Sequence, residues 1–369
     1  NYIKALEYYE LASQLNNSDG YLYLADLYYG GKGIPRNYGK AFELYKKSAE
    51  LNNPKSLYNL GNMYLNGIGV TQDIKKAFEY YVLSAKLNNP NALLNLGIMY
   101  IEGQCEKNYV KAKECFDKLA EQNDPKAFLL LGYCYEFGIG VSPNHAKVKE
   151  YYQLAANQNN PIASNELGSI YFKEKNYKLA KYYYELSAKN GCLIAYNNLG
   201  HMYMNCEGIE QDYTEAFKCL KIASQLMIPS ANVNLGVLYY YGLGVEKNYK
   251  EAIKYFEQAS YFNNQDALVN LGIMYFNGIG VDQSYSKSFY YYDRAAKQNN
   301  PKALFNIGNM YYFGNGVQQD YIKARNMYEL AAQQNDPQAL FNLGHLYLFE
   351  LGVKKDDIKA FNYFNLSAR

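Results

Sequence analysis

The chain has 369 residues, of which 49% are apolar and 20% charged, and its 37 basic and 35 acidic residues leave a formal net charge of +2. By length it would hold two or three domains, and this composition excludes wholesale disorder. The near-neutral charge also disfavours a dedicated nucleic-acid binder or a protein held on an anionic membrane surface.

The first predicted element is an amphipathic helix over residues 1–16, which is too charged for the apolar core of a signal peptide. After it a glycine, nearly always preceded by leucine, returns every 36 residues, with one step of 35 and one of 32. The resulting units begin near residues 17, 53, 89, 124, 160, 192, 228, 264, 300 and 336. We therefore expect residues 1–369 to form a single array of repeats. We call the place of this glycine the frame position, occupied by Ala25, Gly61, Gly97, Gly132, Gly168, Gly200, Gly236, Gly272, Gly308 and Gly344.

Each unit is predicted to hold two helices, A and B. In the unit that starts near residue 89, Asn89 can cap helix A and Pro90 can occupy its first turn, where a missing N–H costs little. Helix B follows an Asn, Asp or Ser cap in every copy, the first being Asn1. Most B helices end at an asparagine, and one at Gly191, residue types that readily adopt left-handed backbone. A Gly-x-Gly-Val/Ile turn joins A to B, as at residues 314–317.

Alanine recurs five residues before the frame position and again early in helix B. Small side chains at these places let helices approach closely, and a single hairpin cannot bury its apolar face alone, so the units must stack. We therefore predict an all-α fold, a right-handed α-solenoid of about ten helix-turn-helix repeats of 36 residues. Because the sequence begins and ends within a B helix, we also expect additional repeats or domains of a longer chain, or a partner, to cover the ends.

The run ALFNIGNMYYFGNGV at residues 303–317, followed by Asp320, Tyr321 and Ala324, resembles the Sel1-like repeat family, a relative of the tetratricopeptide repeats. Tetratricopeptide repeats have a period of about 34 residues and lack the Gly-x-Gly insertion. The chain departs from the pattern at residues 171–176, where the glycine turn is missing, and at Met227 and Ile228, which replace the usual asparagine pair. The resemblance implies an adaptor, since Sel1-like proteins act in membrane-protein quality control, signalling and bacteria–host interaction.

The strongest candidate site is a row of asparagines two residues before the frame position. In solenoids of this kind successive A helices line the concave surface, and a side-chain amide both donates and accepts hydrogen bonds, which suits an extended peptide backbone. The alternative is that these amides bond neighbouring helices and only hold the array together. An apolar stripe four residues after the frame position flanks the row, and from it we add Tyr240 and Tyr312 to the candidate partner site. The row consists of Asn59, Asn95, Asn198, Asn234, Asn270, Asn306 and Asn342.

Tyrosine stands three residues after the frame position in every A helix, from Tyr28 to Tyr347. Such regularity indicates packing rather than ligand binding. We predict that each of these rings is buried between helices A and B with its hydroxyl group on a polar partner.

Catalytic and metal-binding patterns are not visible in the sequence. Three scattered histidines are too few for a metal site, and no Ser/His/Asp or Cys/His grouping recurs. We therefore predict no enzyme activity, no metal and no cofactor.

The six cysteines are irregularly spaced, which indicates free thiols in a reducing compartment and favours the cytoplasm. No run of the sequence approaches the roughly 20 apolar residues that a membrane span needs. The cysteines are Cys105, Cys115, Cys134, Cys192, Cys206 and Cys219.

The leading hypothesis is a non-enzymatic adaptor or scaffold that binds a protein or peptide in the concave groove. A helical-repeat nucleic-acid binder is the first alternative, but it would need a basic stripe, and the charge balance argues against one. The second alternative, a weak β-lactam hydrolase like some cysteine-rich relatives, would need paired cysteines in each unit, which this chain lacks.

Overall fold

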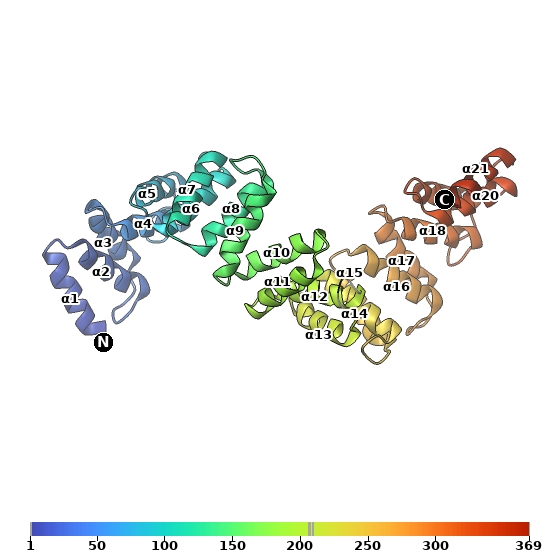
Figure 1. Ribbon diagram of the computed structural model, residues 1–369, viewed down its shortest axis with the longest axis horizontal. Coiled ribbons are helices and arrows are strands. Elements are labelled where there is room, and N and C mark those ends of the chain that lie inside the picture. Colours follow the sequence, from blue (N-terminus) through green and yellow to red (C-terminus); the bar gives the residue numbers. More distant parts are fainter. Residues whose placement is uncertain (1, 206–207, 209, 369) are drawn as a thin grey trace. The chain divides into compact units, whose positions relative to one another are not determined.

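The computed structural model describes residues 2–205, 208 and 210–368, and over these residues the chain forms 21 α-helices and one 3-10 turn, with no strand (Figure 1). The all-α array of helix-turn-helix units is therefore confirmed. The A helices are α2 (Ser18–Gly30), α4 (Pro54–Asn66), α6 (Pro90–Glu102), α8 (Pro125–Phe137), α10 (Pro161–Lys173), α12 (Leu193–Asn205), α14 (Pro229–Tyr241), α16 (Gln265–Asn277), α18 (Pro301–Phe313) and α20 (Pro337–Leu348). The B helices are α1 (Tyr2–Gln14), α3 (Tyr38–Glu50), α5 (Ile74–Lys86), α7 (Tyr109–Glu121), α9 (His145–Asn157), α11 (Tyr177–Lys189), α13 (Tyr213–Ala223), α15 (Tyr249–Ser260), α17 (Tyr285–Ala296), α19 (Tyr321–Ala332) and α21 (Asp357–Ser367).

The predicted helix caps are present in the structure. Asn89 accepts a hydrogen bond from the Ala92 backbone N–H at 3.0 Å, with Pro90 in the first turn of α6. Every B helix from α3 to α21 has an Asn, Asp or Ser cap whose side chain accepts a backbone N–H. The first predicted cap, Asn1, lies outside the described residues.

Asparagine ends most B helices in the left-handed backbone conformation, as the sequence predicted, and Asn263 is typical with φ 54°. Met227 occupies the equivalent place after the 3-10 turn Ser224–Leu226 and has the same φ of 54°. A residue with a Cβ other than asparagine or aspartate pays about 1 kcal/mol for this conformation. The junction between α13 and α14 therefore stores strain that the B-to-A junctions with asparagine at this place lack.

The change Met227→Asn is accordingly expected to raise the free energy of unfolding by about 1 kcal/mol. Met227 is 51% exposed, so little apolar burial is lost with the side chain. Urea titration followed by circular dichroism measures the change. The reciprocal change Asn263→Met should lower stability by a similar amount, and a Met227→Asn protein no more stable than the wild type would contradict the strain argument.

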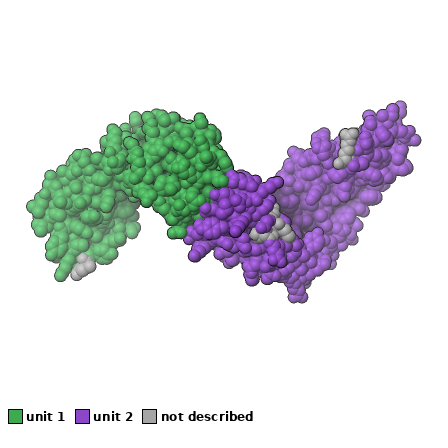
Figure 2. All heavy atoms as spheres, in the orientation of Figure 1, with its two compact units in different colours: residues 1–167 green, residues 168–369 purple. Residues whose placement is uncertain are grey.

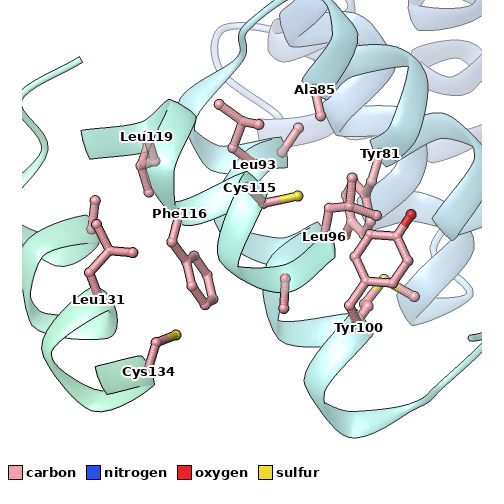
Figure 3. Close-up of a cluster of buried hydrophobic side chains, with 14 of the residues drawn as sticks. Tyr81, Ala85, Leu93, Leu96, Tyr100, Cys115, Phe116, Leu119, Leu131 and Cys134 are labelled. Atoms are coloured by element: carbon pink, nitrogen blue, oxygen red, sulfur yellow. The ribbon is translucent and has the colours of Figure 1, made fainter. Parts of the chain in front are cut away.

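The packing divides the chain into two compact units, Asn1–Leu167 and Gly168–Arg369 (Figure 2). In both units an aromatic ring of a B helix lies against the frame glycine of the preceding A helix. The ring of Phe116 lies against Gly97 in this way, and a Cβ at residue 97 would clash with it. Phe116 and Leu119 of α7 belong to one buried cluster with Leu93 of α6 and Leu131 of α8 (Figure 3). The B helix α7 is thus packed between the A helix before it and the A helix after it.

The tyrosines three residues after the frame position contact both helices of their unit, but most are less buried than predicted. Only Tyr100, Tyr135 and Tyr275 are buried, and the other seven are half-buried. The ring of Tyr64, for example, stacks on Tyr80 of α5 with centroids 5.6 Å apart. Lys76 also lies over this ring, with its Nζ 5.2 Å from the ring centroid. The predicted full burial was therefore wrong for seven of the ten tyrosines, because these rings lie at the solvent edge of the interface between helices A and B.

Candidate functional site

The seven row asparagines are all half-buried, and hydrogen bonding separates six of them, all except Asn198, into two groups of three. In α20, Asn342 donates from Nδ2 to Oδ1 of Asn309 in α18 at 3.1 Å. The Tyr328 hydroxyl of α19 donates to the same oxygen at 2.7 Å and also bonds Asn342. One A helix, its B helix and the next A helix are therefore joined by three polar side chains.

The same bridge recurs twice in the first unit. The Tyr81 hydroxyl donates to Oδ1 of Asn62 at 2.6 Å and bonds Asn95 of the next A helix. Burial raises the pKa of Tyr81 to about 12, so the hydroxyl keeps its proton and remains a donor at neutral pH. Tyr45 likewise donates to an Asp26 carboxylate oxygen at 2.5 Å and bonds Asn59. For Asn59, Asn95 and Asn342 the structure thus favours the helix-tying role.

Asn234, Asn270 and Asn306 have no side-chain hydrogen bond to any described residue. The residue types around them explain the difference. The B-helix residues that would supply a hydroxyl are Leu220 before Asn234 and Phe256 before Asn270. Before Asn306, Tyr292 is present, but the residue after the frame glycine is apolar, and the Tyr292 hydroxyl bonds Ser288 in its own helix instead. These three amides are therefore available for a ligand.

Asn306 lines a cleft of about 400 Å³ between α16 and α18, with Tyr292 of α17 contributing to its wall. Phe276 and Phe313 contribute apolar surface, and Phe313 is 64% exposed. No charged residue lines the cleft. The full lining is Ile273, Phe276, Asn277, Tyr292, Asn306, Asn309, Phe313 and Asn315.

The amides of this cleft retain much of their hydrogen-bonding capacity. Asn309 accepts twice through Oδ1, and its Nδ2 has no partner among the described residues. Asn277 donates from Nδ2 to the Ile273 carbonyl at 2.9 Å, which leaves its Oδ1 to accept. Together with Asn306, they offer donors and acceptors beside two phenylalanines, the chemistry that binds an uncharged peptide segment. The sequence analysis indicated Asn306 but missed Asn309 and Phe313. Asn309 could have been found, because it stands directly after the frame glycine Gly308, where a polar residue can bond the tyrosine of helix B.

Tyr240 and Tyr312 are half-buried and pack against the start of the following B helix. The ring of Tyr312 lies edge-on to Tyr321 with centroids 5.3 Å apart, and Tyr240 meets Tyr249 at 5.4 Å. Burial raises the pKa of both hydroxyls. Each ring therefore has a packing role, and neither belongs to the lining of the cleft between α16 and α18.

Asn198 lines a second cleft, of about 330 Å³, between α10 and α12. It occupies the equivalent place in the repeat, but its lining includes Lys173 and His201 and is therefore polar and partly charged. The structure thus places Asn198 and Asn306 in clefts of different chemistry that share no lining residue.

The described residues contain no cluster of side chains that could hold a metal ion. Cys115, Cys134 and Cys219 are buried, and burial raises the pKa of each thiol to about 11, which keeps them unreactive. Cys206 lies outside the described residues. Within the described ranges no three His, Cys, Asp or Glu side chains group as a metal site would require, and no helix there is long and apolar enough to cross a bilayer.

Comparison with known proteins gives the same repeat along the chain. The family described as Sel1 repeat matches eleven consecutive segments, residues 1–17, 18–53, 54–89, 90–124, 125–160, 161–192, 193–226, 229–261, 265–300, 301–336 and 337–369. A protective antigen of uropathogenic Escherichia coli strains with an SLR fold is similar at a TM-score of 0.92 and 28% identity, covering 99% of this chain and 79% of that one. A Sel1 repeat protein from Oxalobacter formigenes is similar over 55% of this chain and 84% of its own, with a TM-score of 0.51 and 28% identity. No curated protein matches the sequence.

Proposed function

The chain belongs to the Sel1 repeat family, and from that premise we propose that it is a non-enzymatic adaptor that holds an extended segment of a protein partner between its A helices. The observation that carries the proposal is the cleft between α16 and α18, where Asn306 presents an unpaired amide beside Phe276 and Phe313. An extended segment exposes backbone N–H and C=O groups in alternation, and asparagine can bond both. The phenylalanines supply the apolar contact that amides alone lack.

Affinity in this arrangement comes from several weak sites. One amide hydrogen bond contributes about 0.5–1.5 kcal/mol net, so Asn234, Asn270 and Asn306 together contribute roughly 1.5–4.5 kcal/mol. This corresponds to about 10- to 1000-fold in the dissociation constant. The three residues stand in consecutive A helices, α14, α16 and α18, as a segment laid across successive repeats requires.

The change of Asn234, Asn270 and Asn306 together to alanine is therefore expected to weaken partner binding by about 10- to 1000-fold while the helical circular dichroism stays that of the wild type. The probe is a set of 12-residue peptides selected on the wild-type protein from a random displayed library, with affinities measured by isothermal titration calorimetry.

The matched control changes Asn59, Asn95 and Asn342 to alanine. Because these three amides join Tyr45, Tyr81 and Tyr328 to the next helix, their loss should lower the thermal midpoint but leave the peptide affinity of the folded protein within about twofold. Failure to select any peptide, or equal affinity of the wild-type protein and the Asn234/Asn270/Asn306 variant, would overturn the proposed function.

A further inference from the structure

We propose that the cleft between α10 and α12 binds a carboxylate of the partner segment, an aspartate or glutamate side chain; this inference rests on the proposed function and names one feature of the partner. The cleft is lined by one lysine, one histidine, two asparagines, a serine and two aromatic rings, and no carboxylate is among them. The lining residues are Ser169, Phe172, Lys173, Tyr184, Asn197, Asn198 and His201.

The polar groups of this cleft include donors that an anion can use. Asn197 accepts a hydrogen bond from Ser230 Oγ through Oδ1 at 3.2 Å, and its Nδ2 has no partner among the described residues. Nε2 of His201 lies 2.9 Å from Nδ2 of Asn205. The His201 ring thus adds polar surface to the wall of the cleft.

Lys173 supplies the positive charge. It is the last residue of α10, it is exposed, and it forms no ion pair with any described residue. Many lysines elsewhere are paired, such as Lys111 with Glu106 at 3.0 Å and Lys113 with Asp117 at 2.8 Å. An unpaired ammonium group at the edge of a cleft with amide donors gains a charge-assisted hydrogen bond when a carboxylate enters.

The place of Lys173 in the repeat is unusual. It lies five residues after the frame glycine, where the other A helices carry Gly, Asn, Glu or an aromatic residue, and none carries a cation. It also lies within residues 171–176, the one connection from an A helix to a B helix that contains no glycine, so α10 reaches Tyr177 of α11 by a shorter loop. The departure that interrupts the repeat pattern is therefore also the one that puts a cation beside the row asparagine Asn198.

A single carboxylate fits these observations better than a polyanion. A nucleic-acid backbone needs a row of cations at successive repeats. The equivalent cleft between α16 and α18 has none, because Ile273, Phe276 and Asn277 occupy the slots of Ser169, Phe172 and Lys173. One cation with neutral donors matches one anionic side chain in an otherwise uncharged segment.

The test uses the full chain and the peptides selected on it. Each peptide position is changed in turn to alanine and to lysine, and dissociation constants are measured for the wild type, Lys173→Glu and Lys189→Glu. Lys189 is a matched control because it also ends a helix, α11, is exposed, and lies outside the cleft.

We expect one acidic peptide position whose change to alanine weakens wild-type binding by about 10- to 100-fold, the effect of a charge-assisted hydrogen bond. The Lys173→Glu protein should lose that preference, and it should bind the peptide with lysine at this position better than the peptide with the acidic residue. The Lys189→Glu protein should behave as the wild type. Peptides that bind without an acidic requirement, or a preference that Lys173→Glu leaves unchanged, would overturn the carboxylate site while the adaptor function stands. A library that yields no binding peptide would overturn both.

Discussion

Replacing Tyr328 by alanine is expected to lower the free energy of unfolding by about 3–5 kcal/mol. The side chain is fully buried, and its ring lies so close to the frame glycine Gly308 that a Cβ there would clash with it. The ring also belongs to the cluster formed with Leu304 and Leu343, so one truncation opens a cavity at the contact of α18, α19 and α20. The hydroxyl bridge to Asn309 and Asn342 is lost with it.

The conservative change Tyr328→Phe separates these two contributions. It keeps the ring and removes only the hydroxyl, so we expect a loss of about 0.5–1.5 kcal/mol. Phe116 and Phe256 show that the slot accepts phenylalanine. Denaturant titration followed by circular dichroism, supported by hydrogen exchange of α18 to α20, measures the losses, because a repeat array can unfold in parts. Tyr290→Ala is the control, since Tyr290 is 55% exposed. A Tyr328→Ala loss no larger than that of Tyr328→Phe would refute the packing argument.

The helices and their junctions could be predicted because each depends on local chemistry repeated many times. A capping asparagine such as Asn89 and a left-handed asparagine such as Asn263 act within four or five residues of chain, and their signal is visible in one repeat and multiplied by ten. The alanines five residues before the frame position and early in helix B recur with the same period. Their spacing could therefore indicate where helices approach closely.

The roles of the row asparagines could not be separated in this way, because they depend on three helices at once. Asn95 and Asn306 stand in the same slot of the repeat, and their neighbours in sequence follow the same pattern. Only their contacts differ: Tyr81 bonds Asn62 and Asn95, whereas Tyr292 turns to Ser288 because Ile273 offers it no acceptor. The sequence contains this information at one residue after the frame glycine, but its meaning depends on the geometry of the three-helix bridge.

The half-buried tyrosines show a second limit of pattern analysis. A regular slot indicates a structural requirement, but not how far the side chain lies from solvent. The half-buried ring of Tyr64 packs against both Tyr80 and Lys76, so a regular position in the repeat is compatible with partial exposure. Lysine recurs at the third residue of many B helices, which is the signal in the sequence for this arrangement.

Asn232 of α14 departs from the repeat inside the buried core. Its side chain is 0% exposed, and neither Nδ2 nor Oδ1 has a hydrogen-bond partner among the described residues. A buried amide without partners costs about 1–3 kcal/mol. In five other A helices the same slot, four residues before the frame glycine, holds a buried leucine: Leu57, Leu93, Leu268, Leu304 and Leu340.

The change Asn232→Leu is therefore expected to raise the free energy of unfolding by about 1–3 kcal/mol, measured by urea titration. Asn232→Ala removes the amide without adding volume, so it shows whether overpacking, which costs about 1–3 kcal/mol, offsets the gain in the leucine variant. The reciprocal change Leu268→Asn should destabilise the protein by at least the same amount, because it creates the buried unpaired amide where none exists. If both Asn232 variants are less stable than the wild type, the buried amide must have a hydrogen-bond partner in solution. The asparagine at the start of α14 would then be explained by that polar contact and not by a tolerated loss of stability.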